Sequence, residues 1–304
     1  MQNPKSAAAC TRREFLQRTA LTAAALCASP AFGAAESSPR KLFTGIGITA
    51  SIDRAAELKT AGADFIVENV TRFLIPDKPD ADFEPLRAKA KAAPLPVLGG
   101  NGFLRDPKLR CTGPDADHPR VLGFAEVAFR RLRELGGEYI VFGSNTARQI
   151  PEGWPKAKAE EQFIDLLRQM GPLAARHQIT IALEAQQTRE CNYLNHIGEA
   201  AVVVAAVNHP NIRLLADFYH MALMGDTPED LAKAMKWVAV VELAEKEKRT
   251  PPGVAGDDFR PYLAVLAKSG FSGRLDIEAS GTAAQFKTAI ETIHRQVADV
   301  LAAR

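Results

Sequence analysis

Acidic residues end four of the apolar segments in the C-terminal half of this 304-residue chain. Glu184 follows the segment ITIAL, Asp217 follows IRLLA, and Glu242 and Glu278 end two later segments. Carboxylates supply two chemistries, since they bind divalent cations through oxygen and exchange protons with a substrate as general acid or base. Four carboxylates held close together would oppose one another's ionisation, and a divalent cation relieves that repulsion. The four acids therefore predict a metal-assisted proton-transfer site, provided that the fold brings them together.

The segments before Glu184 and Asp217 have the pattern of buried parallel strands. Residues 179–183 form a continuous run rich in β-branched side chains, and residues 212–216 form a second, largely apolar run. Residues 198–207 between them are rich in Ala and Val and have the length of a helix, so the unit fits one right-handed βαβ crossover. Both acids would then emerge at the same end of neighbouring strands.

This alternation of apolar runs and helical patterns continues along the chain and predicts a (β/α)₈ TIM barrel in a single domain over residues 41–304. An open doubly wound sheet is the alternative, but the first predicted strand lacks a Gly-x-Gly-x-x-Gly turn. Barrel enzymes place their active sites at the carboxyl ends of the strands. We expect strands over Leu42–Ile48, Ala63–Glu68, Leu95–Leu98, Tyr139–Phe142, Ile179–Glu184, Ile212–Asp217, Trp237–Leu243 and Arg274–Glu278.

The acids at these strand ends also have a simpler explanation. Any one of them can cap the following helix or pair with a surface lysine. Four at the ends of consecutive strands are harder to explain in that way. Glu242 is the weakest of the four, because Lys246 and Lys248 follow closely and could neutralise it. An all-oxygen ligand set favours Mn²⁺ or Mg²⁺ over a softer metal, and His220 offers a nitrogen nearby.

The N-terminus has the features of a twin-arginine export signal over residues 1–33. Arg12 and Arg13 precede a weakly apolar stretch and small residues near Phe32, and residues 34–40 follow as a linker. The apolar stretch is far shorter than the roughly 20 residues that a membrane anchor requires. A first amphipathic helix of the fold is the alternative. We expect a periplasmic protein, a location that suits free sugars or glycosides better than phosphorylated intermediates.

Charge and cysteine content narrow the function further. The first 33 residues hold four of the 38 basic residues and one of the 36 acidic ones, which leaves 34 against 35. Without a basic excess, nucleic acid is not an expected partner. Cys111 and Cys191 remain after removal of the signal, and two cysteines in a large domain are more often unpaired than bridged.

The chain resembles the xylose isomerase-like sugar epimerases, also called the sugar phosphate isomerase/epimerase group, which includes the ketose 3-epimerases and hydroxypyruvate isomerase. The likeness extends over residues 45–278, nearly the whole of the predicted barrel. The motifs are specific for the family in this order and spacing, and they do not specify a substrate. They are GADFIVEN (62–69), NGFL (101–104), FGSNTAR (142–148), PEG (151–153), LE (183–184), Asn195, NHPN (208–211), DFYH (217–220), PG (252–253) and IE (277–278).

The resemblance implies roles for individual residues. Glu184 and Glu278 match two glutamates that bind the metal and act as the acid/base pair, Asp217 matches a third ligand, and His220 matches a residue that hydrogen-bonds the substrate. Strand 7 departs from the family, because Glu242 stands where a ligating histidine is usual. Lys248 or Arg249 matches an arginine that contacts substrate, and Lys248 is our assignment.

Three further side chains are expected to face the substrate because they follow strand ends. They are Glu68, Asn101 and Phe103, of which the last could stack on a sugar or close the barrel mouth. The implied activity is epimerisation or isomerisation of a carbohydrate by proton abstraction beside a carbonyl. Elimination from a 3-keto-glycoside and a non-catalytic sugar-binding barrel are the alternatives. Family members are often dimers or tetramers, so a homo-oligomer is a possible assembly.

Overall fold

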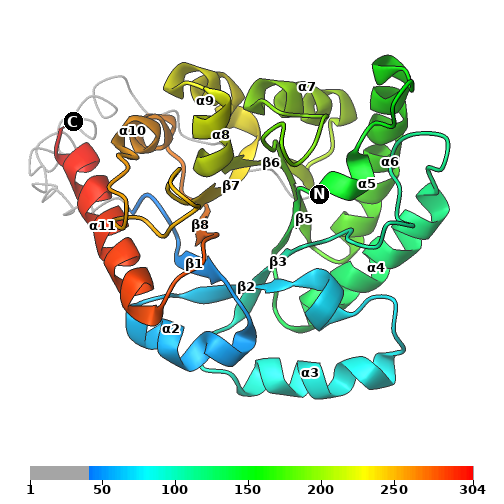
Figure 1. Ribbon diagram of the computed structural model, residues 1–304. Coiled ribbons are helices and arrows are strands. Elements are labelled where there is room, and N and C mark those ends of the chain that lie inside the picture. Colours follow the sequence, from blue (N-terminus) through cyan, green and yellow to red (C-terminus); the bar gives the residue numbers. More distant parts are fainter. Residues whose placement is uncertain (1–40, 304) are drawn as a thin grey trace, which may run out of the picture. The chain divides into compact units, whose positions relative to one another are not determined.

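The computed structural model describes residues 41–303, which fold as a closed barrel of eight parallel strands in chain order (Figure 1). The predicted (β/α)₈ architecture is therefore confirmed. The predicted export signal and the whole of the predicted linker lie outside the described residues. The strands are β1 Ile46–Thr49, β2 Phe65–Asn69, β3 Val97–Asn101, β4 Tyr139–Phe142, β5 Thr180–Glu184, β6 Ile212–Asp217, β7 Val238–Leu243 and β8 Arg274–Ile277.

Helices follow the strands and surround the barrel (Figure 1). The first half of the barrel has η1 Ile52–Arg54, α2 Ala55–Ala61, η2 Val70–Leu74, α3 Asp80–Ala92, α4 His118–Glu134, α5 Asn145–Arg148 and α6 Lys156–Arg176. The second half has α7 Ile197–Val207, α8 Phe218–Met224, α9 Pro228–Ala234, η3 Met235–Trp237, α10 Arg260–Ser269 and α11 Ala283–Ala302.

The strands bury apolar side chains on both faces, as expected of a parallel sheet covered by helices. One buried cluster fills the barrel interior and includes Phe65, Tyr139, Val141 and Leu215. A second and larger cluster lies between the strands and the helices. At the amino-terminal end of the strands, Arg274 donates to both carboxylate oxygens of Glu138, at 2.9 and 2.7 Å. The interior is thus a packed core, and the space for a ligand lies at the carboxyl ends.

Strand boundaries agree with prediction at β4 and β6 and differ most at β1 and β3. Leu42 and Phe43 are buried but precede β1, and β3 extends through the glycines to Asn101. Glycine is a weak strand former, yet here it is required. A Cβ on Gly99 would lie 2.6 Å from the Tyr139 ring, so the ring of one strand fills the space beside the backbone of the next.

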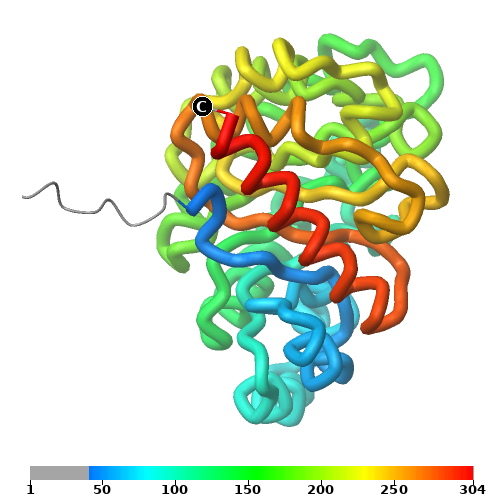
Figure 2. Tube along the Cα trace, turned by 90° about the vertical axis from the view of Figure 1, so that its left-hand side faces the viewer, coloured from blue at the N-terminus to red at the C-terminus, as the bar shows by residue number. Residues whose placement is uncertain are grey.

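The ring of helices closes where the last helix meets the first. In Figure 2, α11 runs beside the blue segment that holds β1 and α2, and α11 packs against both α2 and α10. No helix within residues 41–303 combines the length and the apolar character needed to cross a bilayer.

Candidate active site

The carboxylates predicted to converge do so at the carboxyl ends of β5 to β8. Glu184, Asp217, Glu242 and Glu278 each offer an oxygen, and these oxygens lie within 4.8 Å of one another. The strand register explains the convergence, because Asp217 pairs directly with Glu242 in the β6/β7 ladder. Only Glu278, which follows β8, is partly exposed. A group of oxygens this close and this buried can hold a metal ion.

The Glu184 carboxylate occupies a space that position 143 leaves open. A Cβ on Gly143 would lie 2.1 Å from Glu184 Oε2, so glycine is needed for the carboxylate to sit where it does. Gln186 donates to the same oxygen at 3.1 Å, while Oε1 is buried without a hydrogen-bond partner among the described residues. Arg148, fully buried, donates to the Glu184 carbonyl at 3.0 Å and to the Gly143 carbonyl at 2.5 Å. One oxygen is therefore anchored and the other is free to bind.

Asp217 and Glu278 share one cation, the guanidinium of Arg249. Asp217 caps α8 by accepting from the Tyr219 amide at 2.8 Å, and its other oxygen lies 3.2 Å from Arg249 Nη2. The same Nη2 donates to the Glu278 carboxylate, and Nε donates to the Glu278 carbonyl at 3.2 Å. The guanidinium also lies over the Tyr219 ring at 4.6 Å. Arg249 thus offsets part of the negative charge of the cluster.

Glu242 has no such partner within residues 41–303. It is fully buried, and both carboxylate oxygens lack a hydrogen-bond donor. Lys246 and Lys248 are exposed, and Lys248 pairs with Glu247 at 3.2 Å. The alternative that a nearby lysine neutralises Glu242 is therefore wrong, because the loop turns both lysines outward. A buried carboxylate without donors is costly to ionise, and an added cation would offset that cost.

His220 lies against two of the carboxylates. Its Nε2 is 3.5 Å from Glu184 Oε1 and 3.6 Å from Asp217 Oδ2. The Gln187 amide donates to Nδ1 at 3.2 Å, so the neutral ring holds its proton on Nε2 and points that proton into the site. Burial lowers the pKa of His220 more than the neighbouring Asp217 raises it, which favours the neutral form. This arrangement suits a hydrogen-bond donor to a ligand oxygen.

Burial and mutual repulsion shift the acids toward their protonated forms. Burial, then Asp217 and Glu278, hold the pKa of Glu184 well above its usual value. Burial and Glu278 do the same for the pKa of Glu242. Burial raises the pKa of Asp276, the register partner of Glu242, to about 7, although Thr49 donates a 2.6 Å hydrogen bond to it. The raised pKa values indicate that burial and mutual repulsion oppose ionisation of these acids, and a bound cation would relieve that repulsion.

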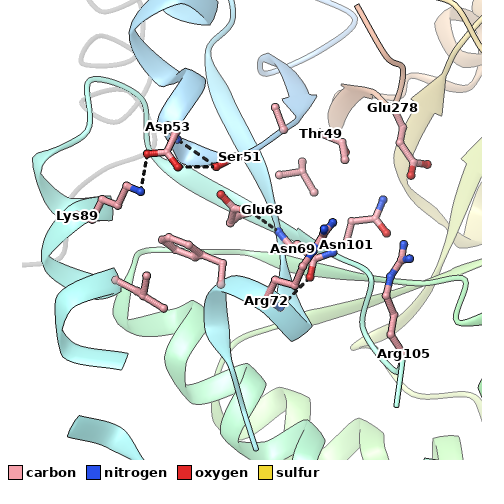
Figure 3. Close-up of a pocket in the computed structure, with 14 residues that line it drawn as sticks. Thr49, Ser51, Asp53, Glu68, Asn69, Arg72, Lys89, Asn101, Arg105 and Glu278 are labelled. Carbon is pink, nitrogen blue, oxygen red and sulfur yellow. Dashed lines mark hydrogen bonds and ion pairs between the residues drawn. The ribbon is translucent and has the colours of Figure 1, made fainter. Parts of the chain in front are cut away.

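A cavity of about 560 Å³ opens beside Glu278, on the β1 to β3 side of the barrel (Figure 3). Glu68 and Asn101, two of the residues predicted to contact substrate, line it. Glu68 also accepts from the amides of Ile52, at 2.5 Å, and Asn69, at 2.8 Å, so it shapes the loop after β1. The volume falls within the range of roughly 300–1,000 Å³ typical of small-ligand sites.

Two of the predicted substrate contacts lie elsewhere. Phe103 is fully buried, with its ring 5.4 Å from that of Phe142 and 5.9 Å from that of Phe129, so it belongs to the core between strands and helices. Lys248 is exposed, and its neighbour Arg249 enters the site instead. Both Lys248 and Arg249 adopt positive φ values of 53°, a turn that sends successive side chains in different directions. Spacing alone could not distinguish the two.

Several side chains around the site were not singled out from the sequence. Arg148 was noted only as part of a family motif, and its buried contacts with carbonyl groups leave no periodic signal. Arg72 and Arg105 line the cavity from two loops. The sequence does contain a signal for both, because each arginine closely follows an asparagine that ends a strand. Cys111 and Cys191 are both buried and free, as expected.

Comparisons with known proteins show the family of this chain. The model of the Xylose isomerase-like TIM barrel family matches residues 52–302. An inosose isomerase of Halalkalibacterium halodurans is 25% identical over 134 residues, 40% of this chain and 47% of that protein. An inosose isomerase of Bacillus velezensis is 27% identical over 173 residues, 53% of this chain and 60% of that protein. The chain thus spans about half the length of the curated relatives it matches.

Solved structures show the same fold at lower identity. The 3-keto-D-glucoside 4-epimerase of E. coli superposes with a TM-score of 0.69 at 19% identity, covering 83% of this chain and 99% of that one. A zinc-bound structure of the IOLI protein superposes with a TM-score of 0.63 at 20% identity, covering 84% and 98%. The second of these shows that a protein of this fold binds a divalent metal.

Proposed function

Because the chain belongs to the Xylose isomerase-like TIM barrel family, we propose that it is a carbohydrate isomerase or epimerase that requires a divalent metal ion. The reaction would move a proton on the carbon beside a carbonyl group. The names of relatives as inosose isomerases and of a similarly folded protein as a sugar epimerase support this class of reaction. The observation that carries the proposal is the group of four converging carboxylates, three of them buried, in which Glu184 and Glu242 have oxygens without a hydrogen-bond partner among the described residues.

The residues present fit a metal ion. Glu184, Asp217, Glu242 and Glu278 would hold it through oxygen, and this donor set favours Mn²⁺ or Mg²⁺. His220 is the less suitable ligand, because its Nδ1 accepts a hydrogen bond and its Nε2 therefore has the proton. When bound, such an ion polarises the substrate carbonyl and lowers the cost of forming an enediolate.

The proton transfers belong to Glu184 and Glu278 in this proposal. β5 and β8 are separated in the barrel by β6 and β7, so the two carboxylates approach the site from different sides. One carboxylate takes the proton from carbon, and the electron pair moves onto the carbonyl oxygen. The other returns a proton to carbon, on the opposite face for epimerisation or on the neighbouring carbon for isomerisation. His220 donates from Nε2 to a substrate oxygen, and Asn101 and Glu68 line the cavity where the rest of the sugar lies.

Metal analysis and proton exchange test the proposal directly. The purified protein is analysed for bound metal, and exchange of sugar C–H protons with D₂O is followed by NMR with D-fructose and related ketoses. We expect exchange that depends on Mn²⁺ or Mg²⁺ and falls by at least about 100-fold in Glu184→Gln and in Glu278→Gln. Protein that takes up no divalent ion, or variants that exchange at the wild-type rate, would contradict it. Sugar binding without exchange would instead indicate a non-catalytic barrel.

Elimination from a 3-keto-glycoside is the second candidate, and the state of Glu242 favours it. A fourth carboxylate ligand reduces the Lewis acidity of a bound cation. A 3-keto-glycoside requires less assistance from the cation than an unactivated sugar, because the neighbouring ketone already makes its C2 proton acidic. One carboxylate of the Glu184/Glu278 pair removes the proton from C2, and the electron pair forms the C1–C2 double bond. The C1–O bond breaks, and the aglycone oxygen takes a proton from the other carboxylic acid of the pair. Release of the aglycone from a chromogenic 3-keto-glucoside would identify this reaction, whereas epimerisation leaves the glycoside intact.

A further inference from the structure

We propose that Arg72 and Arg105 form a subsite for an anionic group, so that the preferred substrate is an acidic sugar derivative rather than a neutral sugar. This inference rests on the proposed function and specifies its substrate class. The shared chemistry is an oxyanion, either the carboxylate of a sugar acid or the phosphate of a sugar phosphate.

The two arginines come from different loops and meet at one cavity. Arg72 lies in η2 directly after β2, and Arg105 lies in the loop after β3. Both line the cavity that Glu278 also lines (Figure 3). In Figure 3 the Arg105 side chain extends from its loop towards Asn101 and Glu278, and Arg72 lies beside Asn69. A ligand in this cavity would therefore touch the arginines and Glu278, one of the two carboxylates assigned to proton transfer, at the same time.

The backbone after β3 is shaped to bring Arg105 to this position. Gly102 has a φ of 66°, and a Cβ there would lie 2.7 Å from Arg105 Nε and 2.5 Å from Asn69 Nδ2. The absence of a side chain at position 102 thus allows the guanidinium to approach the Asn69 amide. The result is a wall of the cavity made of hydrogen-bond donors.

The charges that line the cavity are satisfied, apart from these two. Asp53 pairs with Lys89 at 2.5 Å, Glu278 pairs with Arg249, and the carboxylate oxygens of Glu68 accept backbone amides. Within residues 41–303, neither Arg72 nor Arg105 lies within ion-pair distance of a carboxylate. Both arginines are exposed, so their guanidinium groups are accessible to an oxyanion in the cavity. Guanidinium groups bind carboxylate and phosphate oxygens in pairs of hydrogen bonds.

The separation of charge within the site also gives the substrate a direction. Glu184, Asp217 and Glu242 are not among the residues that line the cavity, whereas the two guanidinium groups line it together with Glu278. An anionic group is repelled from the carboxylates and attracted to the arginines, so the carbonyl end of the molecule faces Glu184 and Glu278. Arg249 does not compete for the anion, because it is already bound to Asp217 and Glu278.

Calorimetric titration of the full-length protein with matched ligand pairs tests this subsite. D-Galacturonate is compared with D-galactose, and D-fructose 6-phosphate with D-fructose. We expect the anionic member of at least one pair to bind about tenfold tighter or more, with a preference that weakens as salt is added. The pair that shows the preference identifies carboxylate or phosphate as the group bound.

The variants Arg72→Gln and Arg105→Gln should each reduce this preference about threefold, and the double variant should abolish it. Arg168→Gln is the matched control, because Arg168 lies on α6 outside the cavity and pairs with Asp165. Equal affinities within each pair, or a preference that survives in the double variant, would overturn the inference. Proton exchange in D-fructose without any preference for anionic ligands would also overturn the inference, while leaving the proposed function intact. Anion preference without exchange in any of the four ligands would retain the subsite and reject the enzyme.

Discussion

Glu184 shows how one carboxylate depends on the residues around it. Its backbone is held by Arg148, one oxygen is bonded by Gln186, and the space it fills exists because position 143 has no side chain. Arg249 has the corresponding role for Asp217 and Glu278. The positions of the acids therefore depend on neighbouring residues such as Gly143 and Arg249. Substitution of these neighbours tests how the site is held.

Gly143→Ala should displace Glu184 without unfolding the barrel, because the nearest atoms to the new methyl group belong to the flexible ends of Glu184 and Gln186. We expect metal affinity and proton exchange each to fall about 10- to 100-fold. Gly123→Ala is the matched control, since a Cβ there meets nothing within 4 Å and alanine favours a helix. Equal metal affinity in both variants, measured by titration with Mn²⁺, would show that Glu184 has room to move.

Arg249→Gln should destabilise metal-free protein by about 1–3 kcal/mol, because two clustered carboxylates lose their shared donor. Lys248→Gln should change stability by less than about 0.5 kcal/mol, since Lys248 is exposed. Urea unfolding in EDTA measures both. Addition of Mn²⁺ should narrow the difference between the variants, and an Arg249→Gln protein as stable as wild type in EDTA would contradict the role given to this guanidinium.

Strands place the acids of the second half, but the loop after β7 decides which basic side chain enters the site. The segment between β7 and α10 is organised by Glu245, which is fully buried. Its carboxylate accepts from the amides of Gly253, at 2.7 Å, and Gly256, at 2.9 Å, and from the Thr250 hydroxyl at 3.0 Å. This network fixes the turn that presents Arg249 and turns Lys248 outward.

Glu245→Gln should destabilise the protein by about 2 kcal/mol at neutral pH, because a charged acceptor of several hydrogen bonds is lost. Although burial raises it, the amides of Ala255, Gly256 and Gly253 lower the pKa of Glu245 overall. A lowered folded-state pKa means that the stabilisation is complete above the unfolded value of about 4.5 and is lost as the pH falls through the folded value. The stability gap between wild type and variant should therefore shrink below about pH 4.5. A gap independent of pH from 7 to 3, measured by thermal unfolding, would contradict the prediction.

At the scale of the whole molecule, the barrel explains why residues more than two hundred positions apart, such as Glu68 and Glu278, form one site. Consecutive parallel strands place all their carboxyl ends at one face, and the β5 to β8 ends contribute the acids while the β1 to β3 ends contribute the cavity with its arginines. The predicted export signal at residues 1–33 also acts on the molecule as a whole, because the location of the protein would determine which sugars reach its active site.

We propose periplasmic export by the twin-arginine route, which replacement of Arg12 and Arg13 by lysine tests. The double variant should accumulate in the cytoplasm at its full length, whereas the wild-type protein should appear in the periplasmic fraction, shortened by about 33 residues. Fractionation followed by mass spectrometry of the intact protein measures both. Equal distribution of the two proteins would contradict the export prediction.

The sequence by itself determined the barrel and the four converging acids. It also determined the carboxyl ends of seven of the eight strands to within about two residues. It could do so because strand patterns are local and a parallel barrel turns strand order directly into spatial order. Only the tertiary structure decided that Arg249 rather than Lys248 enters the site, that Phe103 belongs to the core, and that Glu242 has no lysine beside it. These outcomes depend on loop turns and on packing between distant segments, which periodicity and spacing do not encode.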